Sequence, residues 1–453
     1  MRRSGEAAAT VDIDATQLKQ LFYDFIQAAL QRFIALGLWP RPPAERYIEV
    51  GRHFVVPDVE HLPELKRLHE YFEASEFIKR HYYPQSIMLW TRLLGIVLAE
   101  TDGDRVRVDI LAKHFRRYFR ELARPYATWR QVDTITGLRC ERAFNLDGHS
   151  VVTPLADPSH HLRAWVDFGG LGPSIHDRLA LVTTVTVEKQ SLWSPPHELG
   201  FPERGLALVG AVRLLKPGVP RLHCHANGQL SSFRFERPSG WGDLEGEPIG
   251  NEKEAAIESK DIPRVRALWK DLLPRYQRRW AFATREPRID IPLRRFGRAY
   301  ENTWWLDRVV DLTVAIEALI GPSDQQELRH RVALRAAHLL GSRGNPSQVV
   351  YECVRTMYDA RSTMVHGRRA DEKQQAKWLS TLSGLEYDYN RGIYPLIEPA
   401  LETAREIVSR LIRGCMKLAS ESAPQPSWPL PDDFDRLILE PSERRLWQRK
   451  FQL

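Results

Sequence analysis

The hydrophobic pattern of this 453-residue chain changes twice along its length, and these changes restrict the folds that it can adopt. Residues 15–37 and 62–123 place apolar side chains at helical spacing, with breaks near Pro84 and at the turn that contains Gly103. Between about 130 and 237, β-branched and alternating apolar runs separated by Gly and Pro are typical of an antiparallel sheet or barrel. Helical spacing then returns. The sequence therefore predicts an α+β multidomain protein.

The chain is also too long for one compact core. We expect strands at 181–187, 206–212 and 232–236. The expected segments are a helical N-terminal region (1–125), a β-rich sensor or recognition domain (126–240), a linker (241–261), an all-α C-terminal helical bundle (262–420) and a Pro-rich tail (421–453).

Composition favours some classes of protein over others. The 65 Lys and Arg against 58 Asp and Glu give a net charge of +7, which suits a polyanionic partner such as RNA. The 4 cysteines are scattered without a Cys-x-x-Cys pair, so we expect neither a disulfide framework nor a structural zinc site. No run approaches the ~20 apolar residues of a membrane span. The expectation is a soluble cytoplasmic protein without membrane contact.

One motif near the end of a predicted helix has the chemistry of a metal-free nuclease. Arg361 presents a planar cation that matches a phosphate, and His366 belongs to the residue type that accepts and donates protons near neutrality. The two residues lie ~140° apart around a helix and ~7.5 Å along it. Gly367 is a helix-stop signal, so His366 is expected in the last turn. A two-fold dimer would bring two such motifs around one phosphate.

The residues around this motif resemble a known family. The relevant strings are residues 291–296 (IPLRRF), 305–320 (WLDRVVDLTVAIEALI), 327–337 (ELRHRVALRAA) and 358–367 (YDARSTMVHG). In order and spacing they look like the HEPN superfamily, in particular its Apea-like branch, over roughly residues 262–420. Many HEPN proteins carry Asn, Asp or His directly after the arginine, whereas this chain has Ser362, in agreement with the Apea-like pattern.

The resemblance implies a helical bundle that dimerises and cleaves RNA without metal or cofactor, in anti-phage defence or as a toxin. It also implies that Arg361 and His366 are catalytic and that Ser362 supports them. A regulatory partner or a phage trigger would control activity. The alternative is a non-catalytic HEPN scaffold that dimerises and binds nucleic acid, nucleotide or a partner protein. Without the resemblance, His366 would be a helix-end histidine bonded to a carbonyl, and Arg361 a structural partner of Asp359 or Glu317.

Two further residues are candidates for a supporting role. Glu317 lies in a helix that is apolar almost all round, so its carboxylate needs a partner. It either orients Arg361 or His366, or it pairs with Arg329, Arg335 or another basic residue of the bundle. Tyr358 shares a helix face with Arg361, where it either contacts RNA or packs in the core.

Basic runs with interleaved aromatic residues occur at 113–120 and 275–280. They favour RNA binding, with the alternative of amphipathic helices whose aromatic rings lie in the core. The RNA-binding candidates are Arg116, Arg117, Arg120, Arg278 and Arg279. The string His223-Cys224-His225 is not expected to bind metal, since a strand would place Cys224 on the opposite face. The pair His160-His161 is a still weaker candidate.

Overall fold

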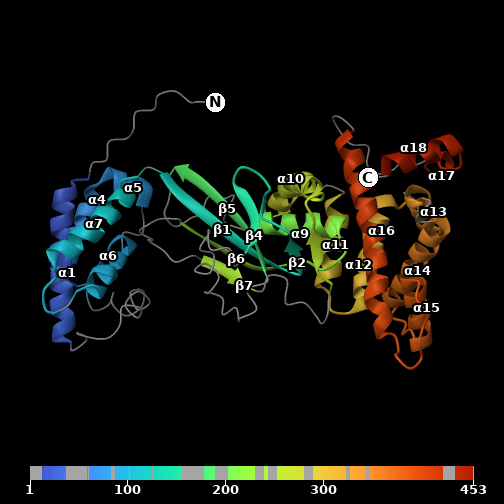
Figure 1. Cartoon of the computed structure of the whole chain (residues 1–453), viewed down its shortest axis with the longest axis horizontal. Helices are drawn as coiled ribbons and strands as arrows, with labels where there is room; N and C mark the ends of the chain where they lie inside the picture. The colour runs from blue at the N-terminus through green and yellow to red at the C-terminus, as the bar shows by residue number, and fades with distance from the viewer. Residues whose placement is uncertain are drawn as a thin grey trace. The chain divides into compact units, whose positions relative to one another are not determined.

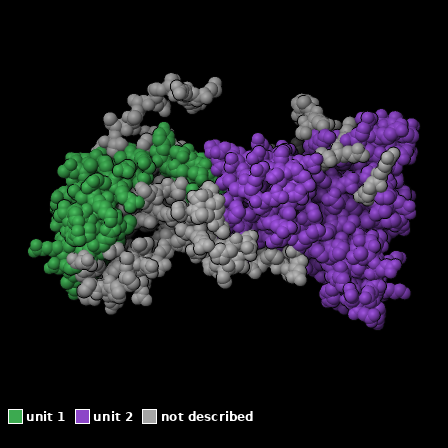
Figure 2. Space-filling model, in the orientation of Figure 1, with its two compact units in different colours: residues 1–132, 182–201, 226–240 green, residues 133–181, 202–225, 241–453 purple. Residues whose placement is uncertain are grey.

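The computed structural model contains helices and strands together with a helical C-terminal region (Figure 1). It describes residues 13–36, 59, 61–82, 87–101, 103–124, 126–155, 178–188, 202–229, 239–242, 253–279, 289–322, 327–342, 346–421 and 434–451. Two compact units are distinguished in Figure 2: unit 1 comprises 1–132, 182–201 and 226–240, and unit 2 comprises 133–181, 202–225 and 241–453. Within the described ranges, no helix has the length and apolar character needed to cross a membrane.

The helices of unit 1 form where apolar periodicity predicts them. They are α1 (Ala15–Ala35), α4 (Pro63–Ala74), α5 (Glu76–Tyr82), α6 (Ile87–Ala99) and α7 (Val108–Leu122).

Helix α1 begins at Ala15, and the carboxylate of its N-cap residue Asp14 accepts hydrogen bonds from the amides of Thr16 and Gln17 at 2.8 and 3.2 Å. Such an N-cap satisfies amides that the first turn leaves without helical partners. The ring of Phe22 packs edge-on against Tyr118, with centroids 5.1 Å apart. Buried aromatic and aliphatic side chains of α1, α4, α6 and α7 share one core.

Strands occupy the middle of the chain. They are β1 (Tyr126–Thr136), β2 (Leu138–Cys140), β3 (Phe144–Asn145), β4 (Ser150–Pro154), β5 (Leu179–Glu188), β6 (Arg221–Gln229), β7 (Ser239–Gly242) and β8 (Ala255–Ile257). One sheet has the order β3-β4-β5-β1-β6-β7, and β2 pairs with β8 in a second. The strand expected at 181–187 is confirmed as part of β5, while 232–236 lies outside the described residues. Pairing is not purely antiparallel, because β2 and β8 run parallel.

The expectation of a strand at 206–212 is wrong, because this segment lies inside helix α9 (Glu203–Leu215). A short apolar run does not distinguish a strand from a buried helix. Here Leu and Ala favour a helix, and two glycines allow close packing. At Gly205 an added Cβ would lie 2.9 Å from the Cβ of Asp133, and at Gly210 it would lie 2.8 Å from the hydroxyl of Tyr276. Burial on nearly all sides hides the amphipathic pattern that would have marked the helix.

The expected linker contains regular structure in the part that is described. Strand β7 falls at its start and β8 near its end. The amide of Ala255 donates to the carbonyl of Gly137 at 2.9 Å, and that of Val219 donates to Lys253 at 3.0 Å. These bonds and the pairing of β8 with β2 fix residues 253–257 within unit 2, so this end of the segment does not behave as a free connection.

The remaining helices belong to unit 2. They are α10 (Ile262–Arg279), α11 (Asp290–Glu301), α12 (Trp305–Ile320), α13 (Leu328–Leu340), α14 (Ser347–Val365), α15 (Glu372–Ser383), α16 (Tyr394–Glu421), α17 (Phe434–Leu437) and α18 (Pro441–Phe451). Helix α12 contacts α11, α14 and α16, and α13 contacts α14 (Figure 1).

The end of the chain packs back on these helices. Helix α18 contacts α13 and α16, where the absence of a side chain at Gly414 leaves room for the ring of Phe451. The Pro-rich stretch at 424–431 lies outside the described residues.

Candidate functional site

Helix α14 ends where the sequence predicts. His366 is its C-cap residue, and Gly367 follows with φ 66°. The amide of Arg368 donates to the carbonyl of Thr363 at 3.0 Å, and that of Gly367 donates to Met364 at 2.9 Å. These two bonds define a C-terminal turn that glycine adopts without steric cost. The turn fixes the backbone of His366 at the end of the helix.

Arg361 lies on the same helix and contacts Glu317 of α12. Its Nη2 lies 3.4 Å from Oε2 of Glu317, and its guanidinium carbon lies 5.6 Å from the ring centroid of Tyr358. Tyr358 precedes Arg361 by one helical turn, so the two share a face. An ion pair and a cation–π contact together hold the guanidinium.

Glu317 pairs with Arg361, a partner that both sequence-based interpretations allow. Arg329 pairs instead with Asp359 at 2.8 Å, and Arg335 pairs with Asp435. Burial raises the pKa of the Glu317 carboxyl, and the positive charge of Arg361 opposes part of that rise. The arrangement fits a positioning role for Glu317 and also fits a structural ion pair.

Polar atoms without partners gather around this ion pair. Nε of Arg361, the hydroxyl of Tyr358 and Oε1 of Glu317 are buried, and none of them has a hydrogen-bond partner among the described residues. A buried donor or acceptor that stays unpaired costs about 1–3 kcal/mol. One donor, one acceptor and one hydroxyl that serves as either can all be satisfied by a bound polar group or water. The site therefore has hydrogen-bonding capacity that the described residues do not use.

The other predicted residues of the motif are more accessible. His366 is exposed and Ser362 is half-buried. Within the described part of the chain, no hydrogen bond joins the side chains of Arg361 and His366. The structure thus brings Arg361, Glu317 and Tyr358 together and leaves His366 at the solvent-exposed helix end.

The arginines predicted to bind RNA are only partly described. On α7, Arg116, Arg117 and Arg120 are exposed, whereas the neighbouring rings of Phe115 and Tyr118 are buried. These two rings are therefore unavailable for base stacking, as the amphipathic-helix interpretation predicts. Arg278 and Arg279 lie in the last turn of α10, but their side chains fall outside the described residues.

Sequence reasoning missed one group of arginines. Arg294 and Arg298 of α11 and Arg213 of α9 line one hollow of unit 2. The adjacent basic residues of α11 were a signal in the sequence. Arg213 gave none, because α9 was not predicted as a helix.

The histidines of β6 are buried. Nδ1 of His225 lies 2.6 Å from Oδ1 of Asp133, and both side chains are inaccessible. The side chain of Cys224 and the pair His160-His161 lie outside the described residues. Across the described ranges, no three His, Cys, Asp or Glu side chains are grouped so as to hold a metal ion.

Comparisons with protein-family models, with curated proteins and with solved structures found no match for this chain.

Proposed function

We propose that the chain is a metal-independent endoribonuclease of the HEPN type, active in anti-phage defence or as a toxin, with residues 262–420 as its nuclease bundle. One observation carries the proposal: unused hydrogen-bonding atoms surround Arg361, on the helix whose last turn exposes His366. A phosphodiester offers oxygen acceptors to such donors. Residues 1–240 would serve as the sensor or recognition region.

In this proposal, cleavage uses the 2′-hydroxyl of the RNA as the nucleophile. Its oxygen attacks the adjacent phosphorus, the bond from phosphorus to the 5′-oxygen breaks, and a 2′,3′-cyclic phosphate remains. His366 either takes the proton of the 2′-hydroxyl or gives one to the leaving 5′-oxygen. Arg361 stabilises the charge that develops on the phosphoryl oxygens, and Glu317 positions Arg361. No metal enters these steps.

A two-fold dimer supplies what one motif lacks. A single histidine cannot act as base and acid in the same step, whereas the motifs of two subunits provide both groups and a second arginine. We propose that the C-terminal helical region forms this dimer. Mixing wild-type protein with excess His366→Ala protein tests it, because inactive subunits would suppress activity beyond dilution. A fully active monomer would contradict it.

The central experiment measures cleavage of labelled RNA. His366→Ala and Arg361→Ala should each lower the rate by about 100-fold to 10,000-fold while the protein remains folded. The matched controls are His330→Ala, which removes an exposed histidine bonded to Tyr351, and Arg355→Ala, which removes an exposed arginine from α14. Both controls should cleave like the wild type.

The products distinguish this mechanism from others. Cleavage should leave cyclic phosphate ends and should continue in EDTA, whereas loss of activity in EDTA and rescue by magnesium would contradict the proposed site. RNA that is bound but not cut, by wild type and variants alike, would favour the alternative of a non-catalytic scaffold.

A further inference from the structure

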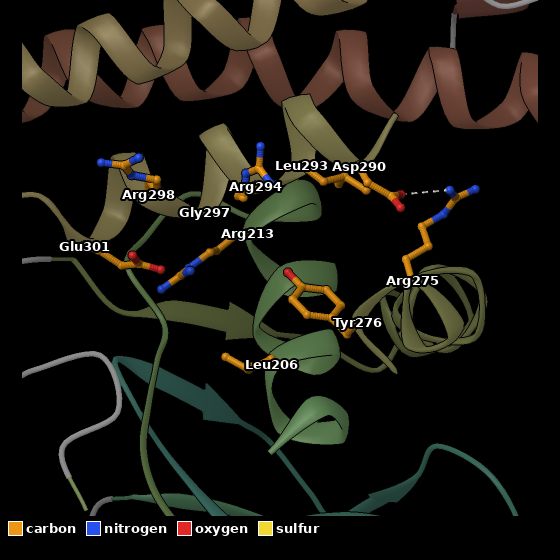
Figure 3. Close-up of a pocket in the computed structure, with 10 residues that line it drawn as sticks. All are labelled: Leu206, Arg213, Arg275, Tyr276, Asp290, Leu293, Arg294, Gly297, Arg298 and Glu301. Carbon is orange, nitrogen blue, oxygen red and sulfur yellow. Dashed lines mark hydrogen bonds and ion pairs between the residues drawn. The ribbon is translucent and has the colours of Figure 1, made fainter. Parts of the chain in front are cut away.

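A basic hollow lies among three helices of unit 2, apart from the Arg361 motif. Helices α9, α10 and α11 form its walls (Figure 3). Its charged lining residues are Arg213, Arg275, Asp290, Arg294, Arg298 and Glu301. Apolar wall comes from Leu206, Leu293 and the ring of Tyr276. Four arginines against two carboxylates leave an excess of two positive charges.

Two of the lining arginines are exposed. Arg275 is neutralised by Asp290, with Nη1 3.1 Å from Oδ1. Arg294 and Arg298 are exposed, and they follow one another by a helical turn on α11. They therefore present two guanidinium groups from the same face.

The side chain of Arg298 can leave its ion pair with Asp311 and contact a ligand without disturbing the fold. Its side chain is 52% exposed and lies 4.0 Å from Asp311. Asp311 already accepts hydrogen bonds from Arg295 at 2.9 Å and from Asn302 at 2.6 Å. The carboxylate stays satisfied when Arg298 turns away. An exposed ion pair at this distance contributes little to stability.

A further positive charge lies in the wall of the hollow. Arg213 is buried, with 5% of its surface exposed, and its Nε donates to the carbonyl of Pro220 at 3.0 Å. Its guanidinium carbon lies 4.3 Å from the ring centroid of Tyr300, and that of Arg405 lies 4.6 Å from the same centroid. The carbonyl of Pro220 and the ring of Tyr300 fix the position of Arg213. Positive charge in a partly desolvated wall favours an anionic ligand.

We propose that this hollow binds a phosphate group in the backbone of single-stranded RNA, with Arg294 and Arg298 as the contacting groups. The inference rests on the proposed function, since it supplies that nuclease with a second point of contact on its substrate. Arginine pairs bind phosphate oxygens with charge-assisted hydrogen bonds. Exposed arginines among the lining residues suit a strand that passes over the hollow better than an enclosed small molecule.

Binding is tested in a His366→Ala background, where RNA is not cut, by fluorescence anisotropy with a single-stranded RNA of about 15 nucleotides. The double variant Arg294→Ala/Arg298→Ala should raise Kd by about tenfold or more. The slope of log affinity against log salt should become shallower by roughly 1.4, since each phosphate contact on a single strand contributes about 0.7. Arg391→Ala, which removes a 76% exposed arginine outside the hollow, should change neither value.

A second pair of variants tests the hollow without removing any arginine. At Gly297 an added Cβ would meet nothing within 4 Å, so α11 accepts larger side chains there. Gly297→Glu should weaken RNA binding, while the isosteric Gly297→Gln should weaken it less. Wild-type affinity in both the double variant and Gly297→Glu would overturn the inference. The inference would also be overturned if these variants lost binding of a mononucleotide but kept the wild-type affinity for RNA. That result would indicate a site for free nucleotide.

The test of the hollow can be distinguished from the test of the proposed nuclease activity. If the intact chain never cleaves RNA but the double variant loses RNA binding, the hollow stands and the catalytic assignment fails. If His366→Ala abolishes cleavage but the hollow variants bind and cleave like their parents, only the hollow is wrong.

Discussion

Two arginine–carboxylate pairs of the C-terminal helical region use their hydrogen-bonding capacity differently. Arg335 on α13 donates from Nε and Nη2 to the two oxygens of Asp435, at 2.5 and 3.0 Å, and from Nη1 to the carbonyl of Ile320 at 3.0 Å. Arg361 reaches Glu317 through one contact of 3.4 Å, and its buried Nε has no partner among the described residues. The guanidinium of Arg335 is hydrogen-bonded through all three of its nitrogens, so we call this site saturated. The guanidinium of Arg361 has an unpaired Nε among the described residues, so we call that site unsaturated.

The difference separates an arginine that holds the fold from one with capacity for a ligand. A buried guanidinium stabilises a fold only when its donors are paired. Arg335 meets this condition, and it fastens helix α17 to α13, with Arg331 adding a bond of 2.7 Å to the same Asp435. Arg361 does not meet it. Its buried Nε, which has no partner among the described residues, is the reason why we propose that Arg361 contacts RNA.

The two carboxylates diverge in the same way. Burial alone would raise the pKa of the Asp435 carboxyl, but hydrogen bonds from Arg335 and Arg331 outweigh burial and hold that pKa below its ordinary value. At Glu317, burial dominates the single charge of Arg361 and the pKa is raised. Strong pairing therefore lowers one pKa, and weak pairing leaves the other elevated.

The largest expected difference is in stability. Arg335→Met should lower the free energy of unfolding by about 3–5 kcal/mol, because it leaves the Asp435 carboxylate facing one arginine instead of two and removes a buried bidentate pair. Arg361→Met, the matched change at the unsaturated site, should cost about 1 kcal/mol or less, since the elevated pKa of Glu317 eases its protonation. Urea unfolding monitored by circular dichroism measures both. Equal losses would show that Arg335 and Arg361 stabilise the fold to the same extent.

The next prediction concerns pH. A carboxyl with a lowered folded-state pKa adds stability above its unfolded pKa of about 4, and this stability is lost as pH falls through the folded value. Asp435→Asn should therefore remove part of the acid-induced loss of stability. A carboxyl with a raised folded-state pKa lowers the free energy of unfolding when it is ionised. This loss of stability is absent below an unfolded pKa of about 4.3 and is complete once pH exceeds the folded value.

Glu317→Gln should thus gain stability relative to the wild type as pH rises above about 4.3. Urea midpoints of wild type and both variants, measured from acidic to neutral pH, reveal the two trends. If the urea midpoints of Asp435→Asn and Glu317→Gln changed with pH in parallel, the two carboxyl groups would not differ in pKa as their contacts indicate.

The sequence predicted local features of these sites better than their partners. Helical spacing located the helices of unit 1, and Gly367 located the end of α14, because both depend on neighbours in the chain. The partner of Glu317 stayed open among Arg329, Arg335 and Arg361, since helices far apart in sequence decide it. For the same reason no local pattern could place Arg213 of α9 beside the arginines of α11.

The smallest effect is expected when one hydroxyl is removed beside the Arg361–Glu317 pair. The ring of Tyr358 is buried and lies under Arg361, while its hydroxyl has no partner among the described residues. Tyr358→Phe keeps the ring and its cation–π contact. Deleting an unpaired buried hydroxyl should leave the free energy of unfolding unchanged or raise it by about 1 kcal/mol. If the hydroxyl serves RNA instead, the same variant should cleave several-fold more slowly. A variant that is less stable yet cleaves at the wild-type rate would place Tyr358 in the core alone, and the unused capacity of the site would then rest on Arg361 and Glu317.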